Sequence, residues 1–117
     1  MIEQKFSYDC AVASLAMFTG KTWDEIFLAF DKPTEGLPTN EVALYLWDNG
    51  FPNIEWRQCH GMPTIKSLVT VKSKNYPGKD HTIYFDGKDF YDPSPKEKYV
   101  SHEDVERNMV GFLSEQP

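Results

Sequence analysis

The most continuous apolar stretch of the chain lies near its N-terminus. From residue 10 to residue 18 nearly every side chain is small or apolar, and Gly20 follows, as glycine commonly does just past a helix end. A helix that is hydrophobic on every face is normally buried. We therefore expect a central buried helix that begins near Asp9 or Cys10 and ends at Thr19-Gly20.

Two shorter helices, each with one apolar stripe, are predicted next. Thr22 and Glu25 have the spacing of a capping box, which begins a second helix that ends before Pro33. Its apolar stripe consists of Trp23, Ile26, Phe27 and Phe30. A third helix is expected from about Thr39 to Asn49. The candidates for its inward face are Val42, Tyr45, Leu46 and Trp47.

The second half of the chain is patterned mainly like strands. Residues 54–58 alternate, residues 65–72 form another extended run, and residues 81–85 and 88–92 flank Asp86-Gly87, a strong hairpin signal. Ser101 and Asp104 then mark the start of a last helix. Its expected apolar stripe is Val105, Met109, Phe112 and Leu113.

Length and charge narrow the class of protein. The 117 residues are most simply one domain, residues 1–117, with a sizeable core. The net charge of −6 argues against nucleic acid as a partner, because phosphate binding needs clustered lysine and arginine. No stretch has the roughly 20 apolar residues of a membrane span, and the N-terminus lacks a signal-peptide pattern. We expect a cytoplasmic protein with no membrane partner, in which Cys10 and Cys59 are both reduced.

The hairpin predicts a contact between His81 and Asp92. If Asp86 and Gly87 alone form the turn, pairing proceeds backward two positions at a time. His81 then lies opposite Asp92, with Cβ atoms about 4.5 to 5.5 Å apart, so that the carboxylate can accept a hydrogen bond from the imidazole. Ile83 and Phe90 share this face, which we expect to look toward the core and the buried first helix.

Four residues together have the roles that cysteine-dependent acyl transfer requires. Cys10 lies at the first turn of a helix, where unpaired N–H groups and the helix dipole favour a thiolate. His81 is the candidate base, and Asp92 is the candidate group that orients it. Gln4, in the preceding loop, is the candidate second donor to an oxyanion, beside the Cys10 backbone N–H. The expected reaction is attack of the thiolate on an acyl carbon, followed by hydrolysis of the thioester.

The same residues resemble a known family. The run from Gln4 to Met17 looks like the start of the papain-like cysteine peptidases, and specifically of the bacteriocin-processing peptidases that cleave after double-glycine leaders. His81 with the strand that follows it, and Asp92-Pro93, resemble the histidine strand and the Asp-Pro of that family. Residues 46–51 resemble the end of its third helix.

The resemblance implies an α+β, papain-like fold, in which an N-terminal helix bundle carrying the cysteine packs on an antiparallel sheet. It also implies that Cys10 is the nucleophile, His81 the base, Asp92 its partner and Gln4 the oxyanion-hole residue. The implied substrate is a peptide or protein. Ala11 stands where the leader peptidases commonly have glycine, so the resemblance is carried to the chemistry and not to a double-glycine substrate.

Two other functions are compatible with the same residues. One is a non-catalytic binding or inhibitor module that engages a protein partner through its acidic surface. The other is an acyltransferase in which an amine replaces water. Cys59 and His60 are not a second catalytic pair, because neighbouring strand residues point to opposite faces, and we expect Cys59 to be packing. We predict no cofactor and no metal, since no Cys/His cluster has zinc-ligand spacing.

Overall fold

The computed structural model describes residues 1–58, 61–96, 99 and 101–116, and these residues form four helices and five strands. The strands make one antiparallel sheet in the order β1-β5-β2-β3-β4. The elements are α1 (Cys10–Thr19), α2 (Trp23–Ala29), α3 (Thr39–Asp48), β1 (Ile54–Gln58), β2 (Ser67–Lys72), β3 (Asp80–Phe85), β4 (Phe90–Tyr91), α4 (His102–Asn108) and β5 (Met109–Glu115). The chain is therefore α+β, as the sequence predicts.

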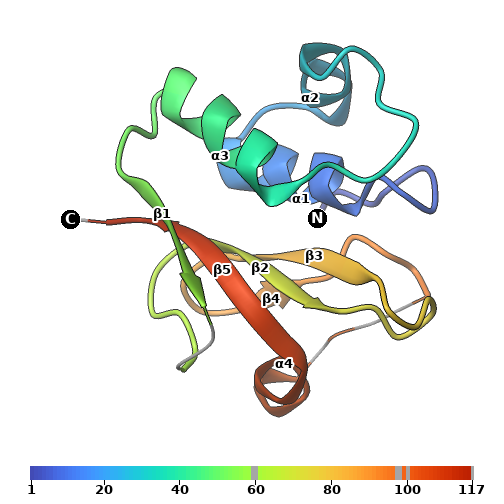
Figure 1. The fold of residues 1–117 in the computed structure, drawn as a ribbon, viewed down its shortest axis with the longest axis vertical. Coiled ribbons are helices and arrows are strands. Elements are labelled where there is room, and N and C mark those ends of the chain that lie inside the picture. Colours follow the sequence, from blue (N-terminus) through green and yellow to red (C-terminus); the bar gives the residue numbers. More distant parts are fainter. Residues whose placement is uncertain (59–60, 97–98, 100, 117) are drawn as a thin grey trace.

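The three N-terminal helices lie on one face of the sheet and α4 lies on the other (Figure 1). Helix α1 is the buried centre of the first layer, since Ala13, Leu15 and Ala16 are all 0 % exposed. The hydroxyl of Ser14 donates a hydrogen bond of 2.9 Å to the carbonyl oxygen of Thr82, which joins α1 to β3. Gly20 ends the helix in the left-handed conformation. The prediction of a central buried helix with these limits is confirmed.

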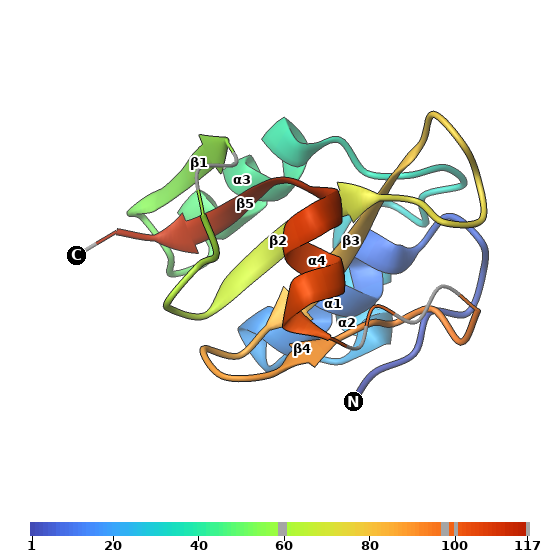
Figure 2. The same cartoon turned by 90° about the horizontal axis from the view of Figure 1, so that it is seen from below.

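The other face of the sheet has its own apolar cluster. Ile83 and Phe85 pack there with Val105 of α4, whereas Leu68 and Tyr84 contact the cluster that contains α1. The prediction that the face bearing Ile83 looks toward the first helix is therefore wrong. The sheet is covered on both faces (Figure 2), so an apolar face of β3 need not be the one that meets α1.

The C-terminal segment differs from the prediction. The last helix begins with the expected Ser101 cap, which accepts a hydrogen bond from the N–H of Asp104, but it ends at Asn108. Met109 to Glu115 is instead strand β5, paired on both sides with β1 and β2. A short apolar run cannot be assigned to helix or strand by periodicity alone. Gly111 disfavours a helix interior, and pairing with two neighbouring strands decides the outcome.

The hairpin also has a different register. Phe85 pairs with Phe90 and Tyr84 with Tyr91, so residues 86–89 form the connection. Asp86 does not adopt the positive φ that a two-residue type I′ turn needs. Its carboxylate instead accepts hydrogen bonds from the backbone N–H groups of residues 88 and 89, at 2.8 and 2.7 Å. This local bonding builds a longer turn and shifts the register by two residues.

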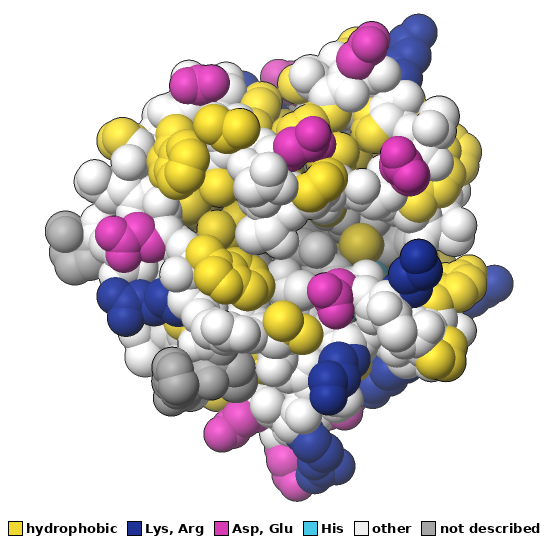
Figure 3. Space-filling view, in the orientation of Figure 1, with side chains coloured by type: hydrophobic (Ala, Val, Ile, Leu, Met, Phe, Trp, Pro, Cys, Tyr) yellow, Lys and Arg dark blue, Asp and Glu magenta, His cyan; other side chains and the backbone are white. Residues whose placement is uncertain are grey.

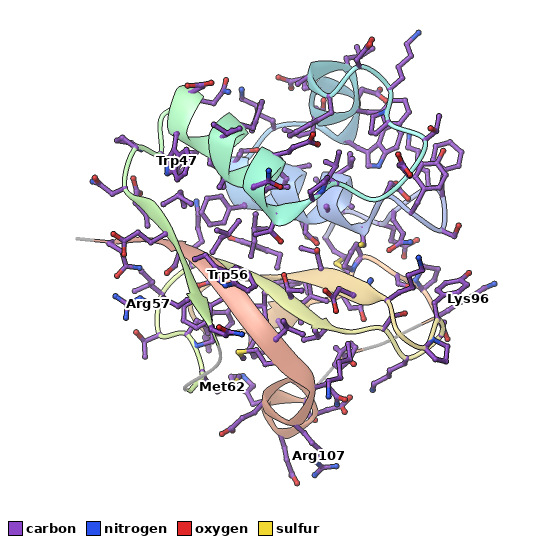
Figure 4. The ribbon with its side chains drawn as sticks, in the orientation of Figure 1. Trp47, Trp56, Arg57, Met62, Lys96 and Arg107 are labelled. Atoms are coloured by element: carbon purple, nitrogen blue, oxygen red, sulfur yellow. The ribbon has the colours of Figure 1, made fainter. Side chains whose placement is uncertain are left out.

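The middle helices follow the sequence closely, with one exception. The capping box of Thr22 and Glu25 is present at α2, and Trp23 is buried at its start. On α3, Trp47 is 45 % exposed, and on β1, Trp56 is 40 % exposed. The prediction that Trp47 belongs to the inward face of its helix is therefore wrong. Figure 4 shows Trp47 near the end of α3 and Trp56 on β1.

Candidate functional site

Cys10 is the first residue of α1 and carries a free, partly exposed thiol. The apolar run after it makes the helix, and the loop of residues 4–9 leads the chain into its first turn. The start of α1 and the start of β3 lie at the same end of the molecule, on the right in Figure 1. The cysteine is thus at an open helix end that faces the strand carrying His81.

His81 contacts both Asp92 and Cys10. Its Nε2 lies 2.7 Å from Oδ1 of Asp92, and both side chains are almost completely buried. Burial opposes protonation of the imidazole, but hydrogen bonds with Asp92 and Cys10, together with their negative charges, raise the pKa of His81 from 6.5 to about 10. Because Nε2 is bonded to Asp92, Nδ1 is the nitrogen left for the thiol. The predicted contact between His81 and Asp92 is confirmed.

His81 still contacts Asp92, although the predicted strand register is wrong, because the observed register differs from it by an even number of residues. A shift of two keeps every side chain on the same face of the strand, whereas a shift of one reverses it. Asp92 follows β4 directly and, in the observed register, lies diagonally across from His81. Diagonal neighbours on one face remain within reach of long side chains.

Asp92 is fixed by the loop that follows it. Its Oδ1 accepts a hydrogen bond of 2.9 Å from the N–H of Ser94, and its Oδ2 accepts one of 2.8 Å from the N–H of Tyr99. Tyr99 is 1 % exposed. Residues 93–98 are polar or proline, and no role is predicted for Tyr99, which follows them. The available signal was a lone large aromatic residue directly after that polar segment.

Asp9 is a second buried carboxylate that sequence reasoning missed. It is 1 % exposed and accepts hydrogen bonds from the N–H groups of Lys5 and Phe6 and from the indole of Trp23, at 2.7 to 2.8 Å. It does not cap α1 with its side chain. Asp9 therefore folds the loop of residues 4–9 onto itself and attaches it to α2.

Gln4 lies close to the site but is engaged elsewhere. Its Nε2 donates a hydrogen bond of 2.7 Å to the carbonyl oxygen of Phe6, and its backbone N–H donates to the carbonyl oxygen of Pro93 at 2.9 Å. Among the described residues, its buried Oε1 has no hydrogen-bond partner. The structure thus places Gln4 in the loop before Cys10 with its amide group turned toward the loop.

Cys10 borders one pocket, which adjoins a second. One, of about 340 Å³, is lined by Tyr8, Cys10, Glu35, Tyr76, Asp80 and His81 among others. The other, of about 240 Å³, includes Gln4 and Lys96, and it shares Ser7 and Tyr76 with the first. The space-filling view shows this face hollowed between the helices and the loops of the sheet (Figure 3). Cys10 and His81 thus open into the first pocket, and Gln4 borders the second.

The remaining sequence candidates add no further centre. Cys59 and His60 lie outside the described residues. The expectation that Cys59 is a packing residue therefore stays a prediction. His102 is exposed at the start of α4. No group of three or more metal-ligand side chains occurs within the part of the chain that is described. No helix in that part is long and apolar enough to cross a membrane.

Comparisons with known proteins do not identify the chain: no family model, no curated protein and no solved structure matches it.

Proposed function

We propose that this protein is a cysteine-dependent hydrolase of the papain-like class that cleaves peptide or related amide bonds. The observation that carries the proposal is the position of His81, which contacts the Cys10 thiol on one side and the Asp92 carboxylate on the other. This order of nucleophile, base and orienting group is the one that thiol-based acyl transfer needs. The His81 side chain is only 3 % exposed, so water screens its interactions with the two partners little.

In the first half of the proposed reaction, a proton is held on His81 and the Cys10 sulfur is a thiolate. The thiolate attacks the carbonyl carbon of the substrate and forms the C–S bond, while the carbonyl oxygen takes the negative charge. The intermediate collapses, the C–N bond breaks, and His81 delivers its proton to the departing amine. Asp92 keeps the imidazole oriented and stabilises its positive charge throughout.

In the second half, water hydrolyses the thioester. His81, now neutral, removes a proton from the attacking water, and the oxygen bonds to the acyl carbon. The C–S bond then breaks, the sulfur leaves as a thiolate, and His81 retains the proton. The carboxylic acid product is released, and the starting charge state of Cys10 and His81 is restored.

The arrangement of the elements supports the papain-like class. The cysteine begins a buried helix, α1, that packs on an antiparallel sheet, the histidine lies on β3 and the aspartate follows β4.

The two pockets are consistent with an extended substrate. The pocket at Cys10 adjoins the second pocket through Ser7 and Tyr76, so an extended substrate bound at the thiol has room to continue along the surface.

A second candidate is a non-catalytic module on the same scaffold, and the observation that favours it is the position of Gln4. Its amide donor is bonded to Phe6, and Gln4 does not line the pocket that contains Cys10. An oxyanion would then have the Cys10 backbone N–H but lack the side-chain donor. Such a protein would bind a peptide in the groove without turning it over.

Site-resolved alkylation with iodoacetamide tests whether Cys10 is an activated thiol, which the catalytic candidate requires. Because His81 contacts Cys10, we expect Cys10 at neutral pH to react much faster than Cys59 in the same chain, and His81→Gln to remove that advantage. Asp92→Asn should reduce it less, since the imidazole remains. Equal, slow labelling of both cysteines in the native protein would reject the catalytic proposal.

A peptide library then tests turnover. Native protein is incubated with the library, and the products are compared with those of Cys10→Ser, which keeps the size of the side chain and weakens the nucleophile. Cleavage that requires Cys10 supports a hydrolase. Reactive Cys10 with binding but no cleavage, in water and with added amine acceptors, favours the binding module.

A further inference from the structure

Strand β1 is unusually open for a sheet strand. In the sheet formed by the described residues it is an edge strand, paired only with β5. Ile54 is buried, but residues 55–58 are all exposed. Exposed edge strands are sites where another strand can add, and proteins generally blunt them with charge, proline or a covering element. The exposed side chains here are Glu55, Trp56, Arg57 and Gln58.

The hydrogen bonds of β1 show which backbone groups face outward. The carbonyl oxygen of Asn53 accepts a hydrogen bond of 2.9 Å from the N–H of Gln116, which continues the β1–β5 register. Hydrogen-bonded pairs alternate along an antiparallel ladder, so Glu55 and Arg57 bond to β5. Ile54, Trp56 and Gln58 therefore direct their N–H and C=O groups away from β5. Consistently, the carbonyl oxygen of Ile54 accepts a hydrogen bond of 2.9 Å from the indole of Trp47.

The backbone groups of Trp56 thus lie at the middle of the open edge. Its indole lies over Gly111 of β5, where even a Cβ atom would come within 2.4 Å of the ring. Although its ring covers the neighbouring strand, Trp56 is still 40 % exposed, and Trp47, whose indole bonds to the carbonyl oxygen of Ile54, is 45 % exposed. Figure 4 shows Trp47, Trp56 and Arg57 on the same side of the molecule. Aromatic residues and arginine are the side chains most enriched at protein interfaces.

We propose that a second copy of this chain pairs with β1, antiparallel and centred on Trp56, so that the two sheets become one continuous sheet. The charges of the strand favour a second copy over an unrelated peptide. Pairing about Trp56 sets Glu55 opposite Arg57 of the second copy, and Arg57 opposite Glu55 of the second copy. Both contacts join opposite charges, and they repeat because the pairing is two-fold symmetric.

The same symmetry explains the exposed aromatic surface. The two Trp56 residues face one another as a hydrogen-bonded pair, with their N–H and C=O groups exchanging two backbone hydrogen bonds. Their indoles lie on the same face of the joined sheet, each over Gly111 of its own copy. Each Trp47 lies at the end of the paired segment, next to Gln58 of the other copy. The interface leaves the groove at Cys10 open, since β1 contributes no residue to either pocket there.

A charge-exchange experiment tests this pairing in the intact chain. The native protein should show a concentration-dependent monomer–dimer equilibrium by analytical ultracentrifugation. Glu55→Arg and Arg57→Glu each place like charges opposite one another twice, and each should weaken the dimer at least about tenfold. An equimolar mixture of these two variants should form a heterodimer, because every facing pair is again opposite in charge. The double variant Glu55→Arg/Arg57→Glu should also regain self-association.

Matched controls carry the same charge changes on α4, where Glu106 and Arg107 are exposed and Arg107 lies far from Trp56 in Figure 4. Glu106→Arg and Arg107→Glu should leave the dimer unchanged. A native protein that stays monomeric up to its solubility limit would overturn the proposal. So would self-association that the β1 variants do not weaken more than the controls, or a mixture of the two single variants that stays monomeric.

Discussion

The ring of Tyr99 stacks on the imidazole of His81, with ring centroids 6.4 Å apart and planes inclined by 24°. The backbone N–H of the same residue donates to Asp92. One residue therefore contacts both members of the buried pair. It is tied to the sheet by its hydroxyl, which donates a hydrogen bond to the carbonyl oxygen of Lys72.

Two replacements of Tyr99 should distinguish the contribution of its ring to stability from that of its hydroxyl group. Tyr99→Phe loses the bond to Lys72 and should lower the free energy of unfolding by about 0.5 to 1.5 kcal/mol. Tyr99→Leu also loses the stack on His81 and should cost about 2 to 4 kcal/mol. Urea denaturation measures both changes. Alkylation of Cys10 should be slowed by Tyr99→Leu and nearly unaffected by Tyr99→Phe, and equal rates in all three proteins would show that the stack does not position the imidazole.

Protonation of His81 should make stability depend on pH. Its pKa is 6.5 in an unfolded chain and about 10 in the folded protein. The stabilisation is fully present below pH 6.5 and is lost as the pH rises toward 10, because the folded protein keeps a proton that the unfolded chain releases. The difference in unfolding free energy between native protein and His81→Gln, from urea titrations, should therefore shrink over this range. A constant difference would contradict the assignment.

Asp9 should stabilise the protein through its three hydrogen bonds. Asp9→Ala leaves the donors of Lys5, Phe6 and Trp23 without this acceptor, and should lower the free energy of unfolding by about 2 to 4 kcal/mol. Asp24→Ala is a matched control, because this exposed carboxylate makes no closer polar contact than one of 3.7 Å, with Lys5, among the residues that the structure describes. It should change stability by less than about 0.5 kcal/mol. If the two variants lost similar amounts of unfolding free energy, the buried hydrogen bonds of Asp9 would contribute no more to stability than a surface charge does.

Gln4 should affect turnover more than stability if it enters the oxyanion site when substrate binds. Gln4→Ala should then reduce kcat by roughly 10² to 10³-fold, on the scale of other oxyanion-hole donors. The unfolding free energy should change little, because the residue gives up one hydrogen bond to Phe6 and a buried oxygen that has no partner among the described residues. Gln4→Glu, which keeps the size but replaces the donor, should be as slow as Gln4→Ala. Unchanged kcat in both variants would exclude this role.

Gly111 should not tolerate a side chain. A Cβ atom there would lie 2.4 Å from the ring of Trp56 and 2.6 Å from the carbonyl oxygen of Arg57. The oxygen belongs to the paired backbone of β1 and cannot move without breaking the ladder. Gly111→Ala should therefore cost at least about 1 to 3 kcal/mol, with amide exchange accelerated first in β1. Native-like exchange in β1 would show that the strand can shift to make room.

The parts of the fold that the sequence predicts are those set by local chemistry. The apolar run after Cys10, the capping box at Thr22 and the glycine at residue 20 each act within one element, and the structure agrees with them. β5 was missed because a segment such as Met109 to Glu115 becomes a strand through its two neighbours, which no local pattern encodes. Tertiary pairing overrides a helical stripe in such cases.

The candidate site also contains some contacts that the sequence predicts and others that depend on the tertiary fold. The contact of His81 with Asp92 was predictable because side-chain parity along a strand survives a two-residue error in register. The contacts of Tyr99 and Asp9 were not, since both depend on where loops fold back. The carboxylates of Asp9 and Asp92 each accept hydrogen bonds from backbone N–H groups of loop residues. The positions of these residues depend on the whole fold.

The anchoring of Asp92 has a consequence for how this protein can vary. Strand β4 ends at Tyr91, and the aspartate is held by N–H groups of residues 94 and 99 that lie beyond the hairpin. The hairpin tip at residues 86–89 is thus mechanically separate from the imidazole. Its length can change, and a fluorophore or affinity tag can be placed there, while the charged pair keeps its position.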